Sequence, residues 1–65
     1  MRSNALRRQV AAEAGALAGA EEEVARAHEH LASRGGDKSD GYLRVAADAR
    51  KIAQFARETQ RRYTD

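Results

Sequence analysis

Residues 10–32 read VAAEAGALAGAEEEVARAHEHLA, and this stretch decides the fold. Large aliphatic residues recur in it every seven positions, at Val10, Leu17, Val24 and Leu31. Each of them is followed by an alanine, so a row of small residues runs beside the row of large ones. A spacing of seven keeps residues on one side of an α-helix. The stretch therefore predicts a long helix that packs against other helices.

The apolar sector of this first helix is wide. The alanines beside the large residues are Ala11, Ala18, Ala25 and Ala32 on one side, with Ala20 and Ala27 on the other. Together they extend the sector to about half of the helix circumference, which is more than one neighbouring helix covers. We therefore expect this helix to contact two neighbours.

A break at residues 34–37, Arg-Gly-Gly-Asp, separates this segment from a second periodic one. Gly35 suits the left-handed position after a helix end, and Asp37 suits the N-cap of the next helix. One domain, residues 1–65, is predicted, with helices over about 4–33 and 38–63 and a turn over about 34–37. A connection this short makes the helices antiparallel neighbours. The expected fold class is all-α, an antiparallel two-helix hairpin.

The second helix carries its own apolar line. Its members are Tyr42, Val45, Ala49, Ile52, Ala56 and Tyr63, with Ala46 and Ala53 alongside. Phe55 lies about 100° away from the centre of this line. A lone hairpin would leave Phe55 in water, whereas two hairpins joined as a four-helix bundle would cover it.

Self-association is expected because the chain is small. A core built from 65 residues is marginal, and the absence of cysteine excludes a disulfide. We predict a homodimer that forms a four-helix bundle. The predicted dimer or partner face consists of Val10, Leu17, Val24, Ile52 and Phe55.

Glu13 interrupts the apolar sector of the first helix. Folding the chain at Gly36 sets Glu13 near the level of Thr59 and Gln60, which interrupt the second helix. A buried carboxylate needs such donors, because an unpaired one costs several kcal/mol. The three residues are predicted to form a polar layer that fixes register. The alternative places Glu13 at the edge of a contact, with its carboxylate in water.

Glu21 and His28 also lie in the apolar sector of the first helix. They stand seven residues apart, about 10.5 Å along the axis, so one helix cannot bring them to one metal ion. A metal or ligand site there would need acids from a second helix or a second copy, and no cofactor is predicted. A hydrogen bond of His28 across a subunit interface is a further alternative. Glu22 is placed to pair with Arg26 on its own helix.

Arginines gather where the two ends of the hairpin meet. The possible phosphate or nucleic-acid contacts are Arg2, Arg7, Arg8, Arg57, Arg61 and Arg62. Arginine near a helix C-terminus is favoured by the helix dipole, whereas Arg7 and Arg8 near an N-terminus are not. A nucleic-acid-binding hairpin is therefore the second hypothesis. A solvated, solubilising end is the simpler one.

The chain lacks a recognisable catalytic motif. It contains no nucleophile beside a base, no glycine-rich phosphate loop and no HExxH. No apolar run approaches the length of a membrane span. We expect a cytoplasmic protein that is not an enzyme and has no membrane partner. Its expected function is that of a small regulatory or interaction module that uses apolar helix faces to bind itself and a protein partner.

Overall fold

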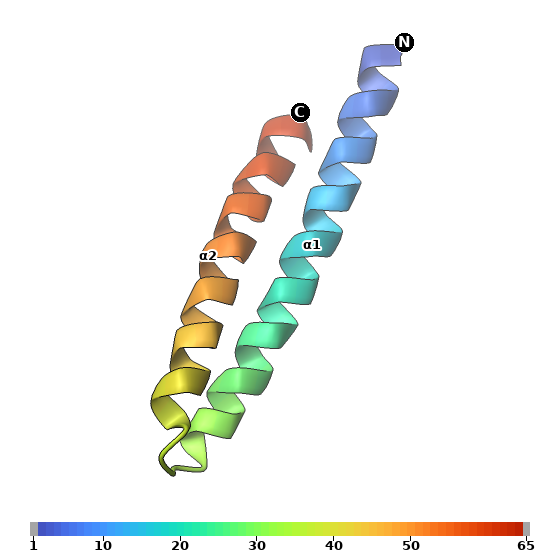
Figure 1. The fold of residues 1–65 in the computed structure, drawn as a ribbon. Helices are drawn as coiled ribbons and strands as arrows, with labels where there is room; N and C mark the ends of the chain where they lie inside the picture. Colours follow the sequence, from blue (N-terminus) through green and yellow to red (C-terminus); the bar gives the residue numbers. More distant parts are fainter. Residues whose placement is uncertain (1, 65) are drawn as a thin grey trace.

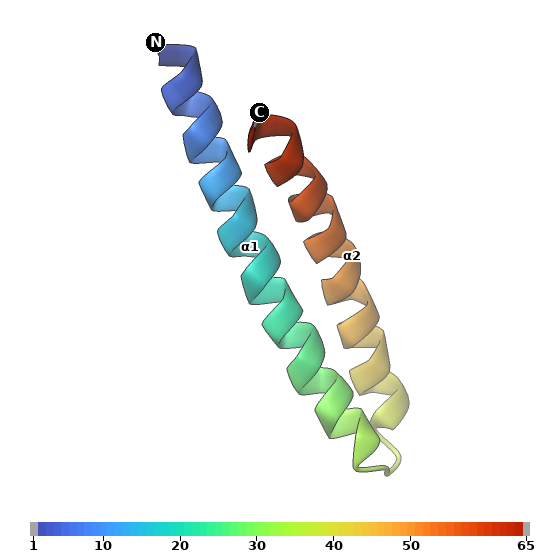
Figure 2. The same ribbon diagram turned by 180° about the vertical axis from the view of Figure 1, so that it is seen from behind.

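The computed structural model describes residues 2–64, with side chains from residue 4 to residue 64. It contains two helices, α1 over Arg2–Ser33 and α2 over Ser39–Thr64. They lie side by side and antiparallel along a hairpin whose Cα atoms extend 54 × 13 × 12 Å (Figures 1 and 2). The N-terminal end of α1 projects past the end of α2. The predicted all-helical hairpin is thus confirmed.

The turn depends on two consecutive glycines. Gly35 and Gly36 have φ angles of 81° and 105°, which side chains with a Cβ rarely adopt. The Gly35 amide donates a hydrogen bond of 3.1 Å to the carbonyl of Ala32. The Ser39 hydroxyl donates to the same carbonyl across the turn, also at 3.1 Å. Ser39, the first residue of α2, therefore ties the start of that helix to the end of α1.

Alanines form the contact between the helices. We call this set the alanine seam: Ala14, Ala18, Ala25, Ala46, Ala49, Ala53 and Ala56. These are the buried apolar residues among those described, and no large side chain is fully buried with them. Helix axes come closest, toward the lower end of the usual range of about 8–10 Å, where the side chains between them are small. Methyl side chains permit this close approach.

The seam corrects the apolar line expected for α2. The expected line includes Val45 and Ile52, but these side chains are 43% and 44% exposed. The buried line runs instead through alanines, among them Ala46 and Ala53, which were expected to lie beside it. The reason is packing distance, because a small side chain lets two helix backbones approach closely and make continuous contact. Larger side chains are turned outward.

Candidate functional site

The large aliphatic side chains of both helices lie outside the alanine seam. Leu17 is 47% exposed and Phe55 is 72% exposed. We call the following set the apolar face: Leu6, Val10, Leu17, Val24 and Leu31 of α1, and Val45, Ile52 and Phe55 of α2. Isolated exposed apolar residues are normal on a protein surface, whereas a large contiguous apolar patch is typical of an interaction site.

The two helices contribute to the same side of the hairpin. On α1, Leu17 comes one residue before the seam residue Ala18, and on α2, Ile52 comes one residue before Ala53. Each aliphatic residue is therefore rotated by about 100° from the seam in the same sense. In an antiparallel pair, equal rotations from the contact line lead to the same side. The apolar face thus runs along one side of the whole hairpin.

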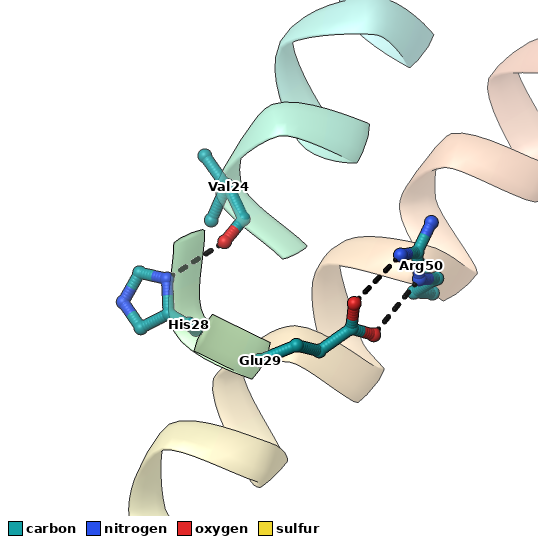
Figure 3. Close-up of polar contacts among 4 residues, drawn as sticks. All are labelled: Val24, His28, Glu29 and Arg50. Atoms are coloured by element: carbon teal, nitrogen blue, oxygen red, sulfur yellow. Dashed lines mark hydrogen bonds and ion pairs between the residues drawn. The ribbon is translucent and has the colours of Figure 1, made fainter. Parts of the chain in front are cut away.

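His28 fixes the position of this face near the turn. Its ring centroid lies 6.0 Å from that of Tyr42 on α2, and its Nδ1 lies 2.8 Å from the carbonyl oxygen of Val24. Figure 3 shows the neighbouring Glu29 pointing away from His28, toward Arg50. Consecutive residues of one helix thus reach opposite sides of the hairpin. His28 and Tyr42 mark the apolar side, and Glu29 marks the other.

The opposite side carries two ion pairs between the helices. Arg50 donates two hydrogen bonds to the Glu29 carboxylate, at 2.8 and 3.1 Å. Arg57 does the same to Glu22, at 2.9 and 3.3 Å. Both pairs occupy positions four residues after a seam alanine on each helix, and bidentate geometry fixes both side chains. We call this side the ion-pair face.

The ion pairs shift the acidity of their members. Hydrogen bonding from Arg57 lowers the pKa of Glu22 below its ordinary value of 4.5, against a smaller opposing effect of desolvation. Hydrogen bonding from Arg50 lowers the pKa of Glu29 in the same way. The pKa values of Arg50 and Arg57 are raised by the same bonds. All four groups are thus held in their charged forms.

These pairs were missed at the sequence level. Glu22 was expected to pair with Arg26 of its own helix, but its hydrogen-bonded partner is Arg57 of α2. The signal was present, because Glu22 and Arg57 occupy the same position relative to seam alanines on antiparallel helices. To recognise this signal, one must know that the contact between the helices runs through alanines and not through the larger residues.

The proposed polar layer is not formed within the hairpin. Glu13 accepts a hydrogen bond of 3.3 Å from Gln9 on its own helix and is exposed. Thr59 donates to the carbonyl of Phe55, also within its own helix. Gln60 accepts a bond from Arg57 and lies against Gly15. The structure therefore brings none of the three predicted members into hydrogen-bond contact with another.

Glu21 and His28 are both half-buried along the edge of the apolar face. His28 directs Nδ1 at the carbonyl of Val24, one turn earlier in α1. Within residues 4–64, no group of three or more His, Asp or Glu side chains is placed to hold a metal ion. Because they stand seven residues apart on α1, Glu21 and His28 are not brought together within the hairpin.

The arginine-rich end is partly used to hold the helices together. Arg7 donates a hydrogen bond of 3.0 Å to the carbonyl of Arg62 and stacks 5.0 Å from the ring centroid of Tyr63. This explains a basic residue near the start of α1, since it satisfies a carbonyl at the end of α2. Arg57 belongs to the ion-pair face. The side chain of Arg2 lies outside the described residues.

The remaining members of the predicted basic set are Arg8, Arg61 and Arg62, whose side chains are exposed. They lie at the terminal end of the hairpin, near the stacked pair of Arg7 and Tyr63. Nucleic-acid binding there stays a prediction, with fewer free guanidinium groups than the sequence suggested.

No protein-family model, curated protein or solved structure matches this chain. Over residues 2–64, neither helix combines the length and apolar character that crossing a membrane requires.

Proposed function

We propose that this protein is a small, non-enzymatic protein–protein interaction module that binds other helices through its apolar face. The observation that carries the proposal is the placement of its large aliphatic side chains. Leu17, Val24 and Ile52 lie outside the contact between α1 and α2, while alanines fill that contact. Amphipathic helices that present aliphatic residues at helical spacing bind other helices in this way.

The first partner of this face is a second copy of the chain, which completes a four-helix bundle. The hairpin is 54 Å long, and two adjacent helices with side chains are about 18 Å wide. Each copy can therefore cover about 1,000 Å², which reaches the size of stable interfaces. A second copy would also stabilise the hairpin, because a core of alanines buries little apolar surface. A regulatory role follows where a protein partner competes for the same face.

A matched pair of leucine variants tests the use of the face. Leu17 lies on the apolar face and Leu43 lies outside it, with exposures of 47% and 50%. Leu17→Lys should convert the dimer into a monomer in size-exclusion chromatography with light scattering. Leu43→Lys should leave the dimer intact. In the unsubstituted protein, the melting temperature should rise with concentration.

Three results would contradict the proposal. A protein that stays monomeric at about 100 μM, far above the Kd of an interface of standard size, would exclude the dimer. Equal effects of the two lysine variants would exclude the apolar face as its site. A mobility shift of nucleic acid that weakens steeply with salt, in a protein that stays monomeric, would favour the basic end instead.

A further inference from the structure

His28 lies among the aliphatic residues of the apolar face. Along α1 it comes four residues after Val24 and three before Leu31, and such spacings keep residues on one side of a helix. With Val45 of α2 it lines one hollow on this side of the hairpin. A second copy that covers the apolar face therefore also covers the imidazole of His28.

The hydrogen bond of His28 decides which ring nitrogen changes its protonation. Nδ1 lies 2.8 Å from the carbonyl oxygen of Val24. A carbonyl oxygen only accepts, so Nδ1 carries a proton in this bond whether the ring is neutral or charged. The proton that is gained or lost with pH is therefore the one on Nε2. This atom points away from α1 (Figure 3), and it reaches solvent in the hairpin.

The charged and titratable groups around His28 leave its two protonation states to the solvent. Asp37 and Lys38 line the same hollow and carry opposite charges. Glu21 stands seven residues earlier, about 10.5 Å along the axis, where salt screens its charge. Tyr42 packs 6.0 Å away between ring centroids, and phenols stay neutral between pH 5 and 8. Within the described part of the chain, the ring bonds a backbone carbonyl and no carboxylate.

Covering this ring affects its two forms differently. Contact with apolar side chains removes the water that solvates an imidazolium, and this costs more than covering a neutral imidazole. Protons therefore bind more readily to the separated hairpins than to the dimer. We infer that the dimer forms with His28 neutral and weakens as the pH falls through the range in which histidine takes up a proton. The inference rests on the proposed function, since it adds pH regulation to the proposed dimer.

Sedimentation equilibrium at two pH values and one ionic strength measures the effect. At pH 5.5 about nine in ten ordinary histidines are charged, and at pH 7.5 about nine in ten are neutral. The Kd of the dimer should therefore rise about tenfold for each copy, and about a hundredfold in all. Helix content by circular dichroism should stay constant, because the carboxylates of Glu22 and Glu29, whose pKa values are lowered, remain ionised in this range.

His30 provides the matched control. It is exposed and lies two residues beyond His28, about 200° around α1. His28→Gln should keep the dimer and lose most of the change in Kd, whereas His30→Gln should keep that change. Equal losses in the two variants, or a Kd that is unchanged or lower at pH 5.5, would overturn the inference and leave the dimer standing. A monomer at both pH values would overturn the inference and the dimer together.

The ring signals of His28 give a second measurement in the unsubstituted protein. When they are followed by NMR, their titration midpoint should move to lower pH as the protein concentration is raised into the range where the dimer forms. The midpoint of His30 should stay constant. A midpoint of His28 that does not depend on concentration, in a sample that dimerises, would show that the dimer leaves this residue in water and would overturn the inference.

Discussion

Gly15 of α1 and the side chain of Gln60 of α2 occupy neighbouring space: a Cβ added to Gly15 would lie 2.6 Å from Nε2 of Gln60. Gly19, one turn further along α1, has nothing within 4 Å of the same position. Two glycines that look equivalent in the sequence thus differ in what surrounds them. The first makes room for a side chain of the opposite helix, and the second has open space beside it.

Alanine substitution should separate these two glycines. Gly19→Ala should raise the free energy of unfolding by about 1 kcal/mol, because alanine favours the helix. Gly15→Ala should gain less than half of this, because Gln60 must move and its hydrogen bond with Arg57 is disturbed. Urea unfolding at one fixed protein concentration measures both. In a Gln60→Ala background the two gains should become equal, and a persistent difference would contradict the explanation.

Enlarging the alanine seam should destabilise the hairpin. Ala25 is fully buried between the helices, so Ala25→Leu should lower the free energy of unfolding by about 1–3 kcal/mol through overpacking. Ala12→Leu, on an exposed position of the same helix, should change it by less than about 0.5 kcal/mol. Thermal unfolding followed by circular dichroism provides the comparison. Equal effects at both positions would mean that the helices do not meet at Ala25.

The ion-pair face should make stability depend on acid. The pKa values of Glu22 and Glu29 are lower in the folded protein than the ordinary value of 4.5. Their contribution is therefore present above pH 4.5 and is lost as the pH falls through the lowered folded values. The melting temperature should drop over that range. The variant Glu22→Gln with Glu29→Gln should show a smaller drop, and an unchanged one would show that other carboxylates cause it.

Arg7 should hold the last turn of α2, and Arg8 should not. Arg7→Gln removes the hydrogen bond to the carbonyl of Arg62 and the contact with the Tyr63 ring. The expected loss is about 1 kcal/mol, with faster amide exchange over residues 61–64. Arg8→Gln, one residue further on, is the matched control. The same increase in exchange for both variants would assign the effect to net charge.

The hairpin itself followed from the sequence, because its signals are local. The seven-residue spacing, the turn glycines and the shortness of the connection each depend on neighbours in the chain. Which residues face the opposite helix did not follow for α2. Hydrophobicity ranks Val45 and Ile52 above Ala46 and Ala53, but the choice is made by how closely two backbones can approach.

The candidate site was predicted as a set of residues and not as a geometry. Val10, Leu17 and Val24 were assigned to a partner face, and the structure places them outside the seam with exposures from 37% to 47%. The polar layer of Glu13 with Thr59 and Gln60 is absent from the hairpin, because each side chain bonds within its own helix. Contacts between helices depend on rotation and height, which composition and spacing leave open.

The alanine seam also governs how the sequence can change without losing the fold. At a position such as Ala18 or Ala53, glycine is small enough for the contact between the helices but lowers the stability of the helix. Serine also lowers it, because its helix propensity is below that of alanine. Valine and every larger residue push the backbones apart. Mutational tolerance should therefore be lowest at the alanines of the seam and highest at exposed arginines outside the ion pairs, such as Arg8 and Arg61. In a library of variants, the alanines would be the positions that selection keeps unchanged.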